Sequence, residues 1–449
     1  MRPYHEAMAE LETDWDRIGA VREEFPDIPR EAVFKEDMLR LGVWFTEAAL
    51  RCAKEYAKKS YFIFSFDRKP LKEIEGSSRF GAPEEIRFSG GDEKLRPTVV
   101  SVRLNNDSPY LVDAEPESAP DESRCRLMLA GKTIAAVDFA PLPPYYGMST
   151  KDGVPLIETA PTIEWGYLLY LTVFRMCQYF GREEECAFCD INRNFKQQRD
   201  AGQVYNATKP VDRIVEALGL IDASGSKSEA YTITGGSITS DLLGKNEIDF
   251  YVQYAEAIER AFPGRWIGKM VVQALPRAEV KRIAEAGIQI YHPNYEVWDK
   301  NLFEKICPGK ARFVGRDEWI SRILDARDCF KPWNIIPNFV AGVEMSRPHG
   351  FATEEEAWAS TGEGLRFFMS HGVIPRFTTW CPEPLSDLGH SGPASLRYHV
   401  GLLKLWRDTQ ESLGVPAPKG YGKPGLGHAV FSVSSFMDVI REPRPNAAV

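Results

Sequence analysis

Residues 166–190 read GYLLYLTVFRMCQYFGREEECAFCD, and this stretch decides how the rest of the chain is interpreted. Its first nine residues, 166–174, form an apolar run that is rich in aromatic and aliphatic side chains, which predicts a buried strand. Three cysteines follow this run, and Cys177, Cys186 and Cys189 are separated by gaps of eight and two residues. In parallel α/β folds the loops after the strands build the active site, so the pattern predicts a site at the carboxyl end of this strand.

Strand-like and helical segments alternate from this stretch to about residue 414, which is the pattern of a parallel sheet made of βα units. The expected strands are 166–174, 229–236, 266–275, 288–297, 334–344 and 373–380. The expected helices are 210–222, 246–261, 276–287, 316–330, 353–372 and 393–414. Six such units predict an α/β fold, a partial or complete TIM-like barrel of about six to eight βα units, with a doubly wound sheet as the alternative.

The chain before the barrel has a different pattern. Residues 1–66 carry apolar side chains at helical spacing, whereas 67–160 contain short β-rich runs separated by turn residues. We therefore expect an N-terminal α+β accessory region, made of a helical segment over 1–66 and a small β-rich part over 67–160. The barrel then spans 161–414, and a C-terminal extension over 415–449 covers it.

Composition and charge narrow the class of protein. The 449 residues include 64 acidic and 55 basic side chains, which gives a formal net charge of −9. A nucleic-acid-binding protein usually has a basic excess, so we expect no nucleic acid as partner. No apolar run reaches the ~18–20 residues of a membrane span and no signal peptide is visible, so we expect a cytoplasmic protein without membrane contact. The oligomeric state stays open.

The cysteine cluster indicates a metal site. Eight cysteines are too few for a disulfide scaffold, and clustered thiols in a reducing compartment are typical of metal binding or catalysis. Three soft thiolates suit an iron–sulfur cluster or zinc, but structural zinc usually takes four ligands and no fourth cysteine or histidine lies nearby. Three thiolates leave one iron of a four-iron cluster open to an external ligand. A three-cysteine zinc site and unrelated thiols are the alternatives.

With Phe188 just before the last cysteine, the motif resembles that of the radical S-adenosylmethionine (SAM) superfamily. Its first gap of eight residues is longer than the spacing that is commonest there. The resemblance implies an oxygen-sensitive 4Fe-4S cluster on Cys177, Cys186 and Cys189, which binds SAM and cleaves it reductively to a 5′-deoxyadenosyl radical. It also implies an electron donor such as flavodoxin or ferredoxin.

Other positions resemble the group that contains biotin synthase, the iron-hydrogenase maturase and methylornithine synthase. The pair Gly235 and Gly236, followed by Ser237 in place of the usual acid, resembles a motif whose backbone carbonyls hold the SAM amino group. Asn294 and Glu296 resemble the pair that binds the SAM ribose. Alternation along a regular strand would turn both of these side chains into the barrel. An ordinary turn and a buried polar pair are the other interpretations.

Two further positions complete the resemblance. Gly342 follows a strand that resembles the one whose backbone frames the adenine of SAM, and Arg322 stands where related enzymes have an arginine for the SAM carboxylate. A guanidinium suits that bidentate role, although a solvated helix residue is the other interpretation of Arg322. We expect His292 to face away from the barrel and Cys307 to be an isolated thiol.

By resemblance, the radical abstracts hydrogen from a small molecule, such as an amino acid or a cofactor precursor. No catalytic side chain is identified, and lyase, mutase, methyl-transfer and sulfur-transfer reactions all stay open. Modification of a protein or RNA, and a zinc-binding barrel without radical chemistry, are the alternative functions. The substrate candidates at the ends of the expected strands are Gln273, Tyr295, Arg376, Thr378 and Trp380, each with barrel packing as the other interpretation.

Overall fold

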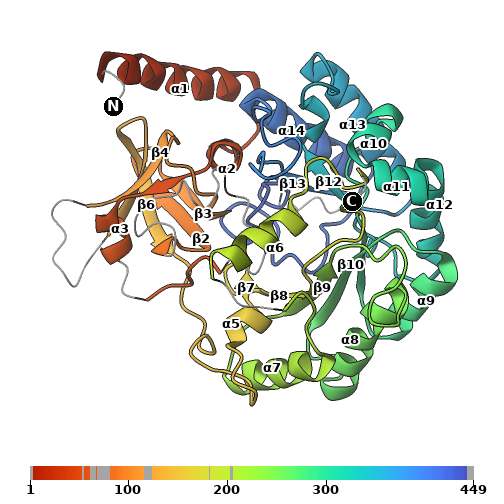
Figure 1. Ribbon diagram of the computed structural model, residues 1–449. Coiled ribbons are helices and arrows are strands. Elements are labelled where there is room, and N and C mark those ends of the chain that lie inside the picture. Colours follow the sequence, from red (N-terminus) through yellow and green to blue (C-terminus); the bar gives the residue numbers. More distant parts are fainter. Residues whose placement is uncertain are drawn as a thin grey trace, which may run out of the picture.

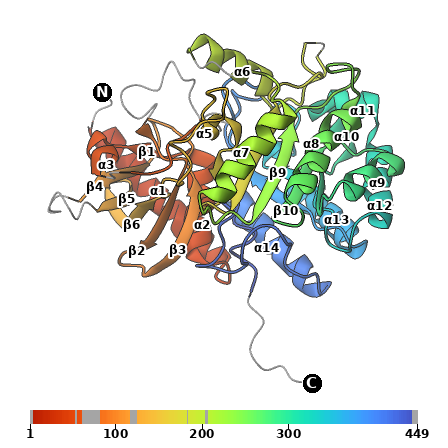
Figure 2. The same ribbon diagram turned by 90° about the horizontal axis from the view of Figure 1, so that it is seen from below.

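The computed structural model describes residues 4–52, 55–60, 67, 81–115, 124–181, 183–202 and 206–441. Figures 1 and 2 show two parts side by side, an N-terminal sheet with its helices and an arc of parallel strands surrounded by helices. No helix in these ranges is long and apolar enough to cross a membrane.

Six parallel strands form the arc, in the order in which they follow along the chain. The five-stranded sheet holds the short antiparallel β7 (Thr162–Ile163) at its edge, followed by β8 (Leu168–Phe174), β9 (Ala230–Gly235), β10 (Ile267–Val272) and β11 (Ile290–Pro293). A second sheet pairs β12 (Asn338–Ala341) with β13 (Arg376–Thr379). Isolated parallel bridges from Tyr291 to Ile335 and from Glu296 to Phe339 join the two sheets.

Helices cover the outside of this arc, as Figure 2 shows for α7 and α8. The helices of the six units are α7 (Val211–Ala223), α8 (Glu247–Ala261), α9 (Arg277–Glu285), α12 (Arg316–Asp325), α13 (Glu354–Ser370) and α14 (Leu396–Ser412). Shorter helices occupy the connections, namely α6 (Ile191–Asp200), α10 (Lys300–Ile306), α11 (Pro308–Phe313), η2 (Ala326–Asp328) and η3 (Val343–Met345). Thr353 and Glu356 form a reciprocal capping box that begins α13.

The α/β class and the six βα units are confirmed, and the barrel is partial. Within the described residues β13 pairs with β12 only, so the arc does not close onto β7 or β8. The observed strands are shorter than the expected ones, most clearly β12 within 334–344. Its flanking residues Ile335, Ile336 and Val343 are buried in the core outside regular pairing, so apolar pattern alone overestimates the strand.

The N-terminal part is built on one six-stranded sheet. Its strand order is β1 (Trp44–Phe45), β4 (Tyr110–Ala114), β5 (Cys125–Leu129), β6 (Lys132–Phe139), β2 (Glu85–Gly90) and β3 (Leu95–Ser101). Its helices are α1 (Tyr4–Glu24), α2 (Arg30–Leu41) and α3 (Glu47–Cys52), and the short α5 (Leu156–Thr159) leads to the barrel. The expectation of a wholly helical segment over 1–66 was wrong at β1. Trp44 and Phe45 pair with β4, because a sheet edge far along the chain is available to them.

The open side of the arc is filled by the C-terminal extension. The backbone amide of Thr379 in β13 donates to the carbonyl of Val433 at 3.0 Å. The amide of Ser101 in β3 donates to the carbonyl of Ser432, also at 3.0 Å. Residues 432–433 therefore run between the barrel and the accessory sheet and take backbone hydrogen bonds from both.

Two buried carboxylates fasten this junction. Glu36 of α2 accepts the Ser435 amide at 2.7 Å and the Thr379 hydroxyl at 2.5 Å. Glu85 of β2 accepts the amides of Glu164 and Trp165, each at 2.8 Å, in the turn between β7 and β8. Since each carboxylate receives donors from other parts of the chain, the accessory region, the barrel and the extension are held as one unit.

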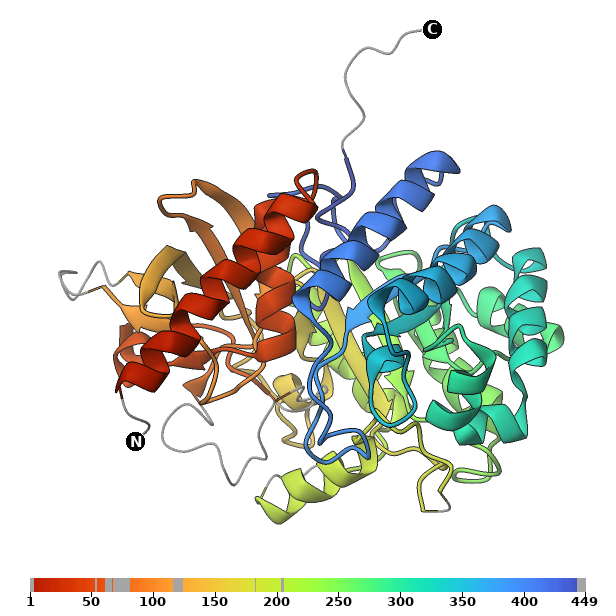
Figure 3. The same ribbon diagram turned by 90° about the horizontal axis from the view of Figure 1, so that it is seen from above.

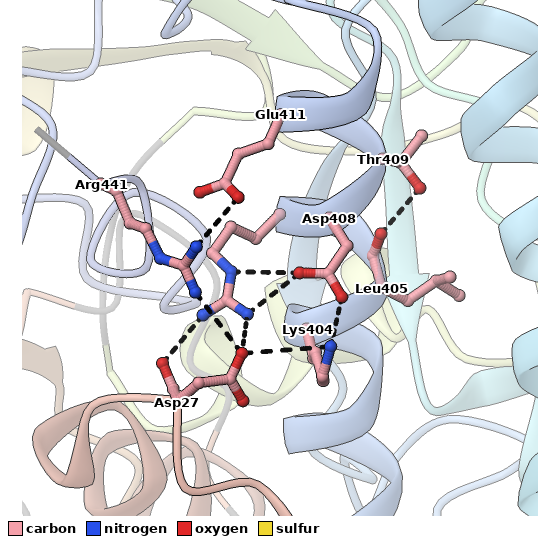
Figure 4. Close-up of polar contacts among 8 residues, drawn as sticks. Asp27, Lys404, Leu405, Asp408, Thr409, Glu411 and Arg441 are labelled. Carbon is pink, nitrogen blue, oxygen red and sulfur yellow. Dashed lines mark hydrogen bonds and ion pairs between the residues drawn. The ribbon is translucent and has the colours of Figure 1, made fainter. Parts of the chain in front are cut away.

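A surface ion-pair network adds to the same association. Figure 3 shows α1 and α14 on the same face of the molecule, and α2 also packs against α14. Figure 4 shows the carboxylate of Asp27, in the α1–α2 connection, between side chains of α14 and Arg441 of the extension. Arg407 of α14 has a nearly buried side chain and donates to the Asp27 carbonyl at 2.9 Å and to its carboxylate.

The Glu85 contact predicts a pH dependence of stability. Burial raises the pKa of Glu85 from 4.5 to about 7, despite the hydrogen bonds that it accepts. Between those values the folded protein binds more protons than the unfolded chain, so its free energy of unfolding falls as the pH rises. The Glu85 contribution to this fall is about 3 kcal/mol at most. Denaturant titrations from pH 4.5 to 7 measure the slope of the free energy of unfolding against pH. Glu85→Gln should lose the Glu85 contribution to this slope.

Glu47→Gln is the matched control, because Glu47 lies on α3 with a side chain that is 65% exposed. This variant should keep the wild-type slope. Equal slopes in wild type and Glu85→Gln would contradict the assignment of the pH effect to Glu85.

Candidate functional site

Cys177, Cys186 and Cys189 line one cavity of about 260 Å³ inside the arc of strands. All three lie in the connection between β8 and α6, just past the carboxyl end of β8. Burial raises the pKa of the Cys177 thiol to about 11 and raises that of Cys189 well above its usual value. Their sulfurs are close enough to influence one another's ionisation, so the loop brings the three thiols together.

Asn192 at the start of α6 holds the first cysteine in place. Its side-chain oxygen accepts the Cys177 amide at 2.7 Å, and its side-chain nitrogen donates to the Cys177 carbonyl at 3.1 Å. The backbone amides of Tyr179 and Ser237 point at the Cys177 sulfur and partly offset the effect of burial on its pKa. Amide donors aimed at a sulfur stabilise its thiolate form, which is the form that binds metals.

The Gly235–Gly236 pair is where β9 meets the cysteine loop. A Cβ atom on Gly236 would lie 2.0 Å from the Met176 carbonyl oxygen and 2.5 Å from the Cys177 Cα. Both glycines and Ser237 line the cavity, but the Tyr251 hydroxyl already donates to the Gly236 carbonyl at 2.7 Å. The pair therefore has a packing role that the resemblance did not assign to it, and one of its carbonyls has an internal partner.

Cys186 also contacts a thiol from outside the cysteine loop, that of Cys307. The Cys307 thiol donates a hydrogen bond to Cys186, and this bond, together with the Lys310 ammonium, lowers the pKa of Cys186. Cys307 is fully buried and does not line the cavity. The expectation that Cys307 is isolated was wrong, because the α10–α11 connection packs directly on the cysteine loop through the Ala187 amide and the Ile306 carbonyl, at 2.8 Å.

Asn294 and Glu296 both line the cavity, but they lie beyond the end of β11. Glu296 has a left-handed backbone with φ of 78°, so its direction comes from a local turn and not from regular strand alternation. Its carboxylate accepts a hydrogen bond from the Lys310 ammonium at 2.5 Å. The Asn294 side-chain oxygen is buried without a hydrogen-bond partner, which leaves it available to a ligand.

Gln273, Arg376, Thr378 and Trp380 line the cavity, and so does Phe188. The Gln273 side chain donates to Glu247 at 2.6 Å and accepts from the Tyr179 hydroxyl, so two internal contacts fix its orientation.

Three predicted site residues lie elsewhere. Tyr295 is buried between Phe303, which stacks on it, and other aromatic rings outside the cavity. Arg322 of α12 does not line the cavity and contacts Glu318 at 2.7 Å and the Ala274 carbonyl at 3.1 Å. Gly342 begins η3 beside His399. The sequence analysis placed Tyr295 at a strand end, and it placed Arg322 and Gly342 by their resemblance to positions in related enzymes. Packing turns all three away from the cavity.

His292 faces the cavity, contrary to the expectation that it faces away. Residues 292 and 294 are two positions apart and therefore share a side of the chain, so the expectation misapplied the alternation. Sequence reasoning also missed Glu164, Lys269 and Thr232 as cavity residues. Lys269 could have been found, since it is the one charged side chain in an otherwise apolar strand, whereas Glu164 carries no sequence signal.

The described residues contain no group of three or more His, Cys, Asp or Glu side chains at the spacing of ligands around a single metal ion. The expected zinc alternative therefore gains no support from this geometry.

No protein-family model matches the chain, and no curated protein matches it significantly. Solved structures that it resembles include methylornithine synthase, with 14% identity, a TM-score of 0.39 and coverage of 58% of this chain and 71% of that one. The FeFe-hydrogenase maturase HydG from Carboxydothermus hydrogenoformans has 12% identity, a TM-score of 0.38, and coverage of 56% and 58%. The cobalamin-dependent S-adenosylmethionine radical enzyme OxsB has 13% identity, a TM-score of 0.31, and coverage of 61% and 40%.

The chain is thus similar to two proteins of the group that its motifs resemble, and it spans little more than half of the maturase and less than half of OxsB.

The contact of Gly236 with the cysteine loop predicts the effect of adding one methyl group. Gly236→Ala should displace the loop, lower the free energy of unfolding by about 1–3 kcal/mol and raise the reactivity of Cys177 toward maleimide. Gly147→Ala is the matched control, because a Cβ there meets nothing within 4 Å. Denaturant titration and mass spectrometry of labelled peptides measure both effects. A Gly236→Ala protein with unchanged stability and Cys177 labelling would contradict the assigned contact.

Proposed function

We propose that this protein is a radical SAM enzyme that acts on a small molecule inside the partial barrel. The observation that carries the proposal is the convergence of Cys177, Cys186 and Cys189 on one cavity, beside polar side chains with free hydrogen-bonding atoms. When bound to these thiolates, a 4Fe-4S cluster supplies the electron that cleaves SAM reductively to methionine and a 5′-deoxyadenosyl radical.

The donor set suits a 4Fe-4S cluster with one open iron. Three thiolates bind three corners of a cubane, and sulfurs at three corners lie farther apart than ligands of a single ion. Cys177, Cys186 and Cys189 all line one cavity of this chain. The amides aimed at Cys177 and the Cys307 thiol beside Cys186 are hydrogen-bond donors of the kind that tune cluster potential.

Side chains next to the thiols would position SAM. The unpartnered Asn294 oxygen accepts a ribose hydroxyl, and the Glu296 carboxylate, fixed by Lys310, accepts a second one. This retains the ribose roles that the sequence predicted for both residues. Arg322 and Gly342 lie outside the cavity, so we assign them no contact with SAM.

The cavity wall would protect the radical. Phe180, Phe188, Trp380 and Phe431 line the cavity and exclude water from the space between the thiols and the barrel floor. The chain's own part in the chemistry is placement and exclusion, since the cofactor carries the reactive atoms. A protein electron donor such as flavodoxin or ferredoxin supplies the electron.

Exchange of single cysteines tests the proposal. Protein purified and reconstituted without oxygen should hold about four irons and four sulfides per chain, and should form 5′-deoxyadenosine from SAM and dithionite. Cys189→Ala removes a ligand and should abolish 5′-deoxyadenosine formation and most of the iron. Cys329→Ala is the matched control, because this half-buried thiol does not line the cavity, and the variant should keep its iron.

Stoichiometric zinc without iron in the wild-type protein would refute the proposal. So would a Cys189→Ala variant with a complete cluster.

A further inference from the structure

The floor of the cavity is charged, although the interior of a closed barrel is normally packed with aliphatic side chains. Tyr170 of β8, Thr232 of β9 and Lys269 of β10 stand side by side in the strand register and all line the cavity. Arg376 of β13 and Glu164 of the β7–β8 turn line the same space. Glu164 and Lys269 are each 2% exposed, and Arg376 is half-buried.

The charged floor lies well below the thiols. Lys269 precedes Gln273 by four residues along β10, and Tyr170 precedes Phe174 by four along β8. Four residues of strand span ~13 Å, so the floor is on the order of 10 Å from the cysteine end of the cavity. A ligand group at the floor is therefore separate from a group bound at the thiols, while both lie in one continuous cavity.

The opposite charges of the floor face each other without pairing. Glu164, Lys269 and Arg376 influence one another electrostatically, yet none of them forms an ion pair within 4.0 Å among the described residues. One Glu164 carboxylate oxygen and the Arg376 Nε have no hydrogen-bond partner. Buried charges are costly unless they are paired, so an anion and two cations held apart indicate that a bound molecule completes the pairs.

Both cations rest on one aromatic residue. The Lys269 ammonium lies 4.2 Å from the ring centroid of Tyr421, and the Arg376 guanidinium lies 5.6 Å from it. Lys269 uses one of its three donors on the Gly420 carbonyl, at 2.8 Å. Its remaining donors and the Arg376 Nε are left for an external acceptor.

His292 does not neutralise this set. Its Nδ1 lies 2.6 Å from the Ile336 carbonyl, which only accepts, so Nδ1 carries the proton. Its Nε2 then accepts from the Tyr421 hydroxyl at 3.2 Å. Burial, together with Arg376 and Lys269, lowers the pKa of His292 well below its usual value, so the ring is neutral.

We propose that the barrel floor binds a small zwitterion, an amino acid or a close derivative, as the second substrate of the enzyme. Arg376 and Lys269 receive its carboxylate, and Glu164 receives its ammonium group. This deepens the proposed function and rests on it only for the reaction, because the charged floor exists independently of the thiols. It leaves the side chain of the amino acid directed toward the thiol end of the cavity, where hydrogen abstraction would take place.

Binding can be measured without turnover. The reconstituted enzyme, with SAM present and no reductant, is titrated by calorimetry with each of the twenty common L-amino acids. We expect one or a few of them to bind. For the tightest binder, the matching carboxylic acid without the amino group and the matching amine without the carboxylate should each bind at least about tenfold more weakly.

Variants assign the two ends of the zwitterion. Arg376→Met should weaken binding of the amino acid by about 30-fold or more, and Arg376→Lys should restore part of it. Glu164→Gln should weaken binding of the amino acid by about tenfold but leave binding of the carboxylic acid unchanged. A purely structural role of Glu164 would weaken both ligands alike. Arg366→Met on the outer face of α13 is the matched control and should bind as wild type does.

The outcomes separate this inference from the proposed function. No binding of any amino acid, together with 5′-deoxyadenosine formation from SAM, would overturn the inference and keep the function. Amino-acid binding with the expected variant pattern, but without a cluster, would keep the inference and overturn the function. If Arg376→Met weakened SAM binding as much as amino-acid binding, the floor would hold the methionyl group of SAM, which would also overturn the inference. Transfer of deuterium from the labelled amino acid into 5′-deoxyadenosine would support both.

Discussion

The structure depends on an incomplete barrel whose open side is filled by other parts of the chain. In the part of the chain that the structure describes, the six parallel strands do not close on themselves, so the edge of β13 needs a partner. Val433 and Ser432 of the C-terminal extension provide it, and their backbone also reaches β3 of the accessory sheet. Glu85 fixes the same junction by accepting the two amides of the β7–β8 turn. The accessory region is therefore part of the cavity wall and not an independent appendage.

An arc completed in this way can keep a polar interior. A closed barrel of eight strands fills its centre with aliphatic side chains, and those layers contribute its stability. Here Thr232, Lys269, Asn294 and Arg376 occupy inward positions, and several of their polar atoms have no internal partner. The protein gives up part of its core packing at these positions, and bound ligands would supply the missing contacts. The aromatic clusters behind the strands and the buried carboxylates at the junction provide stability instead.

The residues that hold the cysteine loop in place are different from the three cysteines that would bind the cluster. Asn192 clamps the Cys177 backbone, and the absence of a side chain at Gly236 lets β9 approach the loop. Cys307, between α10 and α11, and Lys310 of α11 lie beside Cys186. A site fixed by a second set of residues keeps its geometry before any ligand arrives, which is what placement of a reactive group requires. The loop and the charged floor then face each other along one cavity.

The sequence by itself determined the α/β class, the six βα units and the grouping of three thiols after the first strand. These features are local, because strand and helix periodicity and the spacing of neighbouring cysteines are written in adjacent residues. Only the tertiary structure decided that Tyr295 and Arg322 face away from the cavity, that Cys307 touches Cys186, and that Glu164 lies near Arg376. These relations join residues that are far apart along the chain, and the curvature of the strands, the strand ends and the entry of the C-terminal extension set them. No local pattern encodes those three-dimensional distances. The chemistry of the thiols was therefore visible in the sequence, whereas the chemistry of the charged cavity floor was not.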